Sequence, residues 1–351
     1  MAHPRYAYDS AQQSLLLPLY RKFFWGPVLQ WIPRSLAPNT MTLVSTLCCA
    51  TSFALAASLR DHPLAMLAAA ILVVAYFTLD NLDGAQARRI GRSSRLGEFL
   101  DHWLDTLNNG FVVLGAFLAA GLPGLMALGV LACGSLAFFA VQWELRHTGV
   151  FRVGRVGDIE GNTTVALLYV TLAVFGADAF QVAPVPGLPS IAIWLGLGVM
   201  GQALWTVASA LRNVSHGRRD FLPHALSQVA VVGWAITGEI SIPTALGLCF
   251  FLNPVFTAGP VCARLFDRAT PRLDASVAIV LVAATLASLA GVSPVPAQGL
   301  ALGLTLALAV LTAIHLSVAV QALREPAAPT PSGAAEDGVE NPASLALRYR
   351  D

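Results

Sequence analysis

Charged residues are scarce in this sequence. They make up 12% of its 351 residues, whereas hydrophobic residues make up 56%; an ordinary soluble domain carries about 25% charged residues. The mean hydropathy is +0.66, and this composition excludes a soluble enzyme. Basic and acidic residues nearly balance, 21 against 20. The chain therefore lacks the basic surplus that binds nucleic acid through counterion release, and we expect no nucleic-acid partner.

The cysteines give no sign of metal or redox chemistry. All five lie within apolar stretches, and none of their spacings is that of a zinc or redox motif. Buried cysteine behaves as a small apolar residue. We interpret the following side chains as packing residues: Cys48, Cys49, Cys133, Cys249 and Cys262.

Long apolar stretches fill the chain from residue 39 onward. A helix that crosses the hydrocarbon core of a bilayer needs about 20 apolar residues, and ten stretches between Pro, Gly and Arg clusters come near this length. The pattern predicts an all-α fold, a polytopic integral membrane bundle of about ten transmembrane helices. The stretches are 39–59, 63–82, 97–120, 123–145, 164–181, 190–211, 222–239, 244–264, 274–292 and 299–323.

Positive charges indicate how this bundle is oriented. If the N-terminus is cytoplasmic, every Lys and Arg except Arg60 falls in a cytoplasmic segment, as the positive-inside rule requires. The outer connections are then short Pro/Gly segments. We expect both termini, and the face that carries the charged motif described below, on the cytoplasmic side.

The two ends of the chain differ from its apolar middle. Residues 1–38 mix leucines and aromatics with cations, which is typical of an amphipathic segment at a cytoplasmic membrane interface. No small-residue cleavage site follows the first apolar stretch, so we expect no removable signal peptide. Residues 326–351 lack the apolar surface needed to fold. They are predicted to be a disordered cytoplasmic tail after a membrane domain of residues 39–325.

Acidic residues gather in one short part of this apolar chain. Ionisable residues inside membrane spans are costly and usually mark function. Asp80 and Asp83 are three residues apart, so they project from one face of a helix. Asp101 and Asp105 are four residues apart and share a face of the next helix. Four carboxylates are therefore expected to converge between two neighbouring helices.

Converging carboxylates need cations to stay ionised. An all-oxygen site suits Mg²⁺ or Mn²⁺, and four acids can share two ions. The small residues Gly84, Ala87 and Gly97 would leave room for a ligand beside the metals, and Arg88 offers a planar donor fork to phosphate. These features together predict a two-metal phosphoryl-transfer site.

Two other interpretations are open for these acids. They could form a structural salt-bridge network with Arg88, Arg89 and Arg92 that only ties two helices together. Alternatively, ten spans with intramembrane carboxylates could belong to a transporter. The acids, however, form a single cluster near one face, and no second broken segment mirrors it in the other half, as in many transporters.

The spacing of the acidic cluster matches a known motif. Residues 80–105 read D-x2-D-G-x2-A-R-x8-G-x3-D-x3-D. This resembles the signature of the CDP-alcohol phosphotransferase (CDP-alcohol phosphatidyltransferase) family of integral membrane enzymes. With Glu98 and His102 on either side of the third aspartate, the run resembles the choline/ethanolamine phosphotransferase branch. The motif positions are Asp80, Asp83, Gly84, Ala87, Arg88, Gly97, Asp101 and Asp105.

The resemblance implies an enzyme of phospholipid synthesis. It would transfer phosphoethanolamine or phosphocholine from a CDP-alcohol to the hydroxyl of diacylglycerol or a related lipid, releasing CMP, with residues 39–325 as its catalytic domain. A runner-up has CDP-diacylglycerol donate a phosphatidyl group to a small alcohol, and the motif does not separate the two. The family also suggests a homodimer. The expected ligands of two Mg²⁺ or Mn²⁺ ions are Asp80, Asp83, Asp101 and Asp105.

Several residues are assigned to substrate by the same resemblance. Gly84, Ala87 and Arg88 would contact the CDP part. Asn39, within a Pro-Asn-x-x-Thr element, would border the nucleotide pocket, although capping the first helix is an equally good interpretation. Trp143 and Glu160 match the family more weakly.

Glu98 and His102 bear on the chemistry itself. They are four residues apart, so the Glu can orient one imidazole nitrogen while the other faces the site, and His102 would be the general base for the lipid hydroxyl. Asp105 is the competing candidate for this base. A third interpretation leaves His102 as a hydrogen-bond partner of a neighbouring group only.

Overall fold

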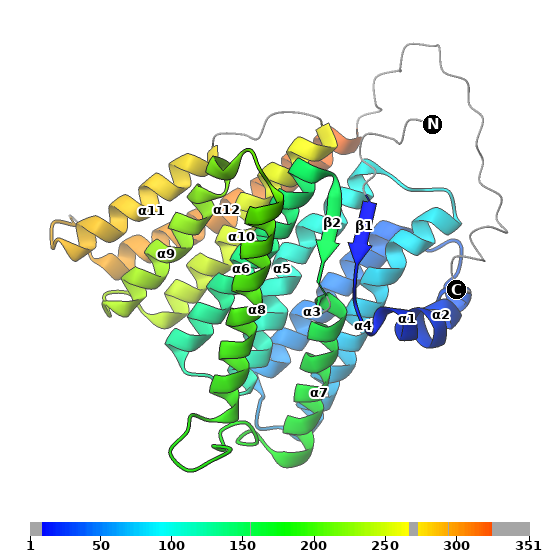
Figure 1. Cartoon of the computed structure of the whole chain (residues 1–351), viewed down its shortest axis with the longest axis horizontal. Helices are drawn as coiled ribbons and strands as arrows, with labels where there is room; N and C mark the ends of the chain where they lie inside the picture. Colours follow the sequence, from blue (N-terminus) through cyan, green and yellow to red (C-terminus); the bar gives the residue numbers. More distant parts are fainter. Residues whose placement is uncertain (1–8, 155, 267–272, 294, 325–351) are drawn as a thin grey trace.

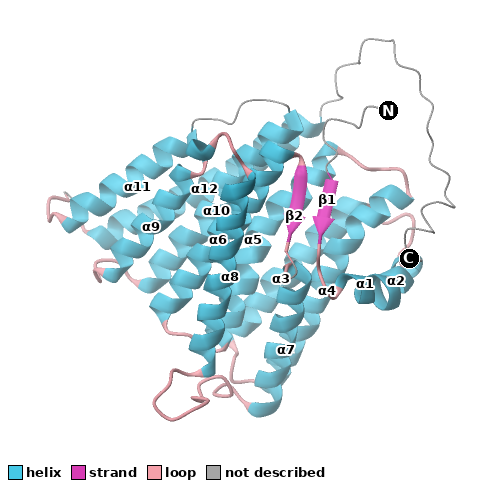
Figure 2. Ribbon diagram, in the orientation of Figure 1, coloured by secondary structure: helices cyan, strands magenta, loops and turns pink. Residues whose placement is uncertain are grey.

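The computed structural model describes residues 9–154, 156–266, 273–293 and 295–324, and most of this chain is helical (Figures 1 and 2). Each apolar stretch predicted above overlaps a helix, so the helical fold class is confirmed. The predicted tail, residues 326–351, lies outside the described residues. The helices are α3 (Pro38–Ser58), α4 (Pro63–Arg89), α5 (Arg95–Ala119), α6 (Gly124–Thr148), α7 (Asp158–Phe175), α8 (Ile191–Asn213), α9 (Leu222–Ile236), α10 (Ile242–Phe266), α11 (Leu273–Leu289) and α12 (Ala297–Arg324).

Six of these helices are long and apolar enough to cross a membrane. They are α3, α4, α6, α8, α10 and α12; within the described residues the other four do not meet the same standard. The chain is therefore a multi-pass integral membrane protein, as its composition predicts. Ten spans and cytoplasmic termini stay predictions.

Two helices, α4 and α7, have bounds that differ clearly from those expected. Helix α4 continues past residue 82 to Arg89, so the whole first half of the acidic motif stands on one helix. Helix α7 begins at Asp158 instead of residue 164, because acidic residues in its first turn favour a helix N-terminus. It ends at Phe175 because Gly176 takes a φ of 90°, which stops the helix.

The N-terminal segment makes an unexpected strand pair. β1 (Asp9–Gln12) runs parallel to β2 (Val150–Val153), with Asp9 opposite Val150. Three short helical pieces follow: α1 (Leu17–Tyr20), a π-helix (Arg21–Trp25) and α2 (Gly26–Trp31). Their exposed aromatic and cationic side chains fit the predicted interfacial segment; among them are Phe23, Trp31, Arg21 and Lys22.

The helices pack side by side in one bundle (Figure 1). Helix α4 packs against α3 and α7, and α5 packs against α3 and α6. Helix α10 joins this group to the later helices, because it contacts α5 and α6 on one side and α9 and α12 on the other. It is also the most buried of the six apolar helices. The acidic motif is carried by α4 and α5, both of which pack against α3, and α10 contacts α5.

Candidate active site

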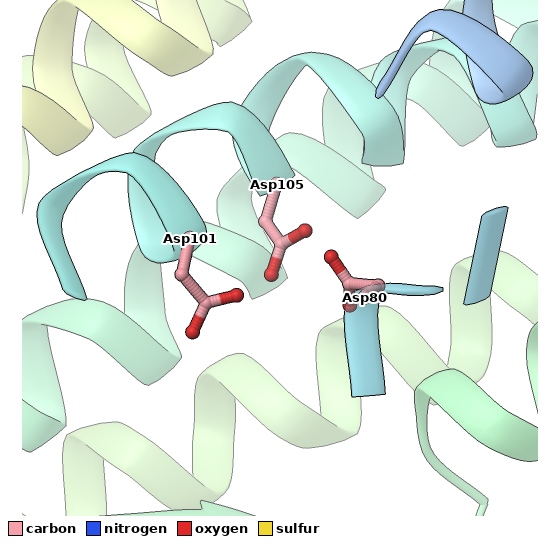
Figure 3. A group of neighbouring side chains, drawn as sticks. All are labelled: Asp80, Asp101 and Asp105. Atoms are coloured by element: carbon pink, nitrogen blue, oxygen red, sulfur yellow. The ribbon is translucent and has the colours of Figure 1, made fainter. Parts of the chain in front are cut away.

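Three aspartates of the motif come together between α4 and α5. Each offers a carboxylate oxygen, and these three oxygens lie within 4.8 Å of one another. Asp101 and Asp105 project from successive turns of α5 toward Asp80 on α4 (Figure 3). Ser94 is the N-cap of helix α5: its hydroxyl oxygen accepts a hydrogen bond from the backbone N–H of Gly97 at 3.0 Å. The helical spacing therefore predicted this convergence correctly for three of the four acids.

The aspartate trio, Asp80, Asp101 and Asp105, fits a divalent cation. All three side chains are half-buried, and Oδ1 of Asp80 is buried with no hydrogen-bond partner among the described residues. Carboxylates this close repel one another unless a cation lies between them, and Mg²⁺ and Mn²⁺ prefer oxygen ligands. Asp105 is held by the amide of Asn108, whose Nδ2 donates to its Oδ1 at 3.3 Å.

Asp83 is not part of the group of oxygens that lie within 4.8 Å of one another. It is buried on α4, and the hydroxyl of Thr42 on α3 donates a hydrogen bond to its Oδ2. Its expected role as a fourth metal ligand stays a prediction. Thr42 was not singled out from the sequence, although it closes the Pro-Asn-x-x-Thr element that begins at Pro38. This element thus carries the contact between α3 and the motif.

The residues expected to bind CDP lie around the ends of the same helices. Asn39 lies beside Gly97, where an added Cβ would come within 3.1 Å of its Oδ1. The N-cap position of helix α3 is occupied by Ala37, so Asn39 is not the N-cap residue of this helix. The absence of a side chain at Gly84 leaves space for Arg88: a Cβ added at Gly84 would lie 3.4 Å from Nη1 of Arg88. Ala87 is half-buried on the same turn.

The structural salt-bridge interpretation finds no support in the described part of the chain. There, none of the ion pairs joins Asp80, Asp83 or Asp101 to the arginines after them. Arg89 instead donates to the carbonyl oxygens of Leu29 at 2.5 Å and Ile32 at 3.0 Å. Arg89, the residue after the motif's Arg88, thus ties the interfacial segment to α4.

His102 and Glu98 each have a partner outside the motif. His102 is buried, and Nε2 of Gln142 on α6 lies 3.2 Å from its Nδ1, within hydrogen-bond distance. The ring of Phe151 on β2 lies 5.7 Å from the imidazole, centroid to centroid. The carboxylate of Glu98 pairs with Arg264 on α10 at 2.5 Å. No local spacing could have predicted these partners.

Glu160 connects the N-terminal segment to the loop before α7. Its Oε1 accepts hydrogen bonds from the hydroxyl of Ser14 at 2.6 Å and from the backbone N–H groups of Leu15 and Leu16. Its Oε2 accepts a hydrogen bond from the backbone N–H of Gly157 at 3.0 Å. Partial burial acts to raise the pKa of Glu160, but these hydrogen bonds outweigh it and hold the pKa below its ordinary value. Glu160 thus ties the N-terminal segment to the start of α7, and we call these contacts of Glu160 with Ser14, Leu15, Leu16 and Gly157 the latch.

A family comparison covers the region that contains this site. Residues 35–204 match the sequence model of the CDP-alcohol phosphatidyltransferase family. The match ends within α8, so the assignment of residues 205–325 to the same domain stays a prediction.

Individual relatives point to one branch of that family. The chain is 31% identical to cholinephosphotransferase 1 of Bos taurus over 60% of its own length and 53% of the relative's. The values for Homo sapiens are the same. It is 34% identical to the Gallus gallus protein over 50% of its length and 55% of the relative's. The chain thus spans about half the length of the curated relatives it matches. Residues 35–204, just under half of the chain, are thus similar to the CDP-alcohol phosphatidyltransferase family, and the relatives that the chain resembles belong to its choline/ethanolamine phosphotransferase branch.

Proposed function

We propose that this protein transfers a phosphoalcohol from a CDP-alcohol to the hydroxyl of diacylglycerol or a related lipid. The observation that carries the proposal is the aspartate trio, formed by motif residues of two helices within a membrane protein. The relatives described above are named cholinephosphotransferases. Phosphocholine and phosphoethanolamine are therefore the groups we expect to be transferred.

The trio and Asp83 are proposed to hold two divalent ions, Mg²⁺ or Mn²⁺. When bound, such ions would neutralise charge on the pyrophosphate and its leaving group. Gly84 and Ala87 keep the surface beside the aspartates free of bulk, and Arg88 and Asn39 would bind phosphate and nucleotide groups. These residues orient the CDP-alcohol with its reacting phosphorus toward the membrane.

The transfer then requires a base for the lipid hydroxyl. His102 accepts the hydroxyl proton while the oxygen forms a new bond to the phosphorus that carries the alcohol. The bond from that phosphorus to the bridging oxygen breaks, and CMP leaves. Gln142 and Phe151 would orient the imidazole, and Glu98, one turn earlier, pairs with Arg264. Asp105 remains the alternative base.

A substrate panel tests this proposal directly. The purified protein in lipid vesicles is given Mg²⁺ or Mn²⁺ and labelled CDP-choline, CDP-ethanolamine or CDP-diacylglycerol, each with its acceptor. We expect phospholipid and CMP from at least one CDP-alcohol with diacylglycerol. Product only from CDP-diacylglycerol and a small alcohol would overturn the proposed direction of transfer. Metal-independent flux of a solute without product would instead indicate a transporter.

A further inference from the structure

Helix α10 lies outside the matched residues 35–204, yet it packs against the helix that carries Asp101, His102 and Asp105. In Figure 1 it passes beside α5. We propose that α10 is a brace that sets the position of α5 and that Arg264 is a positioning residue for the reaction. This inference rests on the function proposed above and assigns a role to the second half of the chain.

Two side-chain hydrogen bonds join the helices in opposite directions. The indole Nε1 of Trp103 donates to the carbonyl oxygen of Pro254 at 3.2 Å, and Nδ2 of Asn253 donates to the carbonyl oxygen of Thr106 at 3.2 Å. Trp103 and Asn253 are buried, where a polar group that loses its partner is costly. The two bonds therefore oppose both sliding and rotation of α5 against α10.

Close packing supports the same register. Gly110 of α5 faces the ring of Phe250 on α10, and a Cβ on Gly110 would come within 2.5 Å of that ring. Only glycine allows the two helices to approach this closely at this point. The contact lies one turn beyond Thr106, so the brace extends along α5 past Asp105.

A buried ion pair completes the brace at the start of α5. Arg264 and Glu98 side chains are 8% and 14% exposed, and Nη1 of Arg264 lies 2.5 Å from Oε1 of Glu98. Removing one partner of such a pair leaves an uncompensated buried charge. Arg264 therefore compensates the negative charge of Glu98 and fixes the orientation of its side chain, one turn before His102.

The brace residues alternate with the site residues on the same turns of α5. Glu98 precedes Asp101 and His102, while Trp103 and Thr106 flank Asp105. Any movement of α5 that breaks the brace must also move the trio and the imidazole. A misplacement of about 1 Å at a reacting group costs about 100-fold in rate, so a positioning role predicts a loss in kcat more than in substrate affinity.

The activity test compares Arg264→Gln, Arg264→Lys and the control Arg60→Gln. Arg60 also forms ion pairs, but with Asp61 and Asp178 in the connections at the far end of the helices. With CDP-choline and diacylglycerol, we expect Arg264→Gln to lower kcat at least about tenfold and to change KM less than about threefold. Arg264→Lys should restore most of the loss, and the control should match the parent. Parental kcat in Arg264→Gln would overturn the proposal.

Amide hydrogen exchange tests the brace without any substrate. In Asn253→Ala and Arg264→Gln, peptides covering residues 97–109 of α5 should exchange at least about tenfold faster than in the parent, while peptides of α3 stay unchanged. Unchanged exchange in α5 would overturn the brace, even if Arg264→Gln proved unstable. If the parent protein is inactive on every CDP-alcohol, the proposed function is overturned instead. The hydrogen-exchange rates of α5 would still show whether α10 acts as a brace.

Discussion

At the scale of single residues, the aspartate trio concentrates negative charge where an apolar bundle would not tolerate it unpaired. Its three oxygens lie within 4.8 Å of one another. Asp80 contributes from α4, while Asp101 and Asp105 contribute from α5. Each carboxylate therefore matters both as a ligand and as the counter-charge of the cations it holds.

Replacing Asp80, Asp101 or Asp105 by Asn is expected to abolish transfer. A bound metal contributes several kcal/mol of charge stabilisation, so losing a ligand should slow turnover by more than about a hundredfold. Initial rates over a Mg²⁺ and Mn²⁺ titration measure this. Asp178→Asn, at an exposed aspartate far from the motif, is the control. Near-normal activity in two of the three variants would contradict the metal site.

Asp83 needs its own test because Thr42 already satisfies one of its oxygens. If Asp83 binds metal, Asp83→Asn should lose activity as fully as the trio variants and require more Mg²⁺. If it only connects α3 to α4, its loss should equal that of Thr42→Ala, with an unchanged metal requirement. The metal concentration that gives half-maximal rate separates the two outcomes.

His102 and Asp105 compete for the role of base. If His102 takes the proton, His102→Ala should slow the chemical step by about 10²- to 10⁴-fold with little change in CDP-alcohol affinity. Glu98→Gln and Gln142→Ala should cause smaller losses, because each leaves a less well oriented imidazole in place. Single-turnover rates at saturating metal measure this. His102→Ala within about threefold of the parent, well short of the 10² expected, would leave Asp105 as the base.

At the scale of elements, the latch at Glu160 holds the N-terminal segment onto α7. A lowered pKa means that the ionised form stabilises the folded state. This stability is fully present above the unfolded-state pKa, and it is lost as the pH falls through the lower, folded-state pKa. The strand pair β1–β2 also joins the N-terminal segment to the loop before α7, and Phe151 of β2 lies beside His102.

Glu160→Gln should therefore destabilise the protein in a pH-dependent way. At pH 7 we expect a loss of about 1.5–3 kcal/mol, the usual contribution of a hydrogen bond to a charged group. Thermal melts of parent and variant from pH 7 down to pH 3 should show this difference shrinking below the ordinary glutamate pKa of 4.5. A difference that is constant with pH would show that the charge on Glu160 is not what stabilises the latch.

At the scale of the whole molecule, the distribution of positive charge predicts the orientation in the membrane. Six helices are long and apolar enough to cross it, and the distribution of arginines predicts ten spans with cytoplasmic ends. In a variant without the native cysteines, single cysteines at Ser93 and Ser215 should react only from the cytoplasmic side. A cysteine at Pro184 should react only from the opposite side. Labelling of Ser93 and Pro184 from one side would contradict the predicted helix count.

The sequence by itself determined which apolar segments are helical and which aspartates come together. Both depend on short-range information: the length of apolar runs, and spacings of three and four residues that bring side chains to one helix face. This was enough to place Asp101 with Asp105 and to expect Asp80 opposite them. It also sufficed to identify the family motif.

Only the tertiary structure decided what holds that motif in place. Ser14 and Glu160, Glu98 and Arg264, and Thr106 and Asn253 are each more than a hundred residues apart. Hydropathy and helical periodicity describe one segment at a time, so they carry no information on which distant side chain will reach a buried carboxylate or carbonyl. The surroundings of Asp83 show the same limit: Thr42, on another helix, donates a hydrogen bond to its Oδ2, a contact that the spacing of the aspartates could not have predicted.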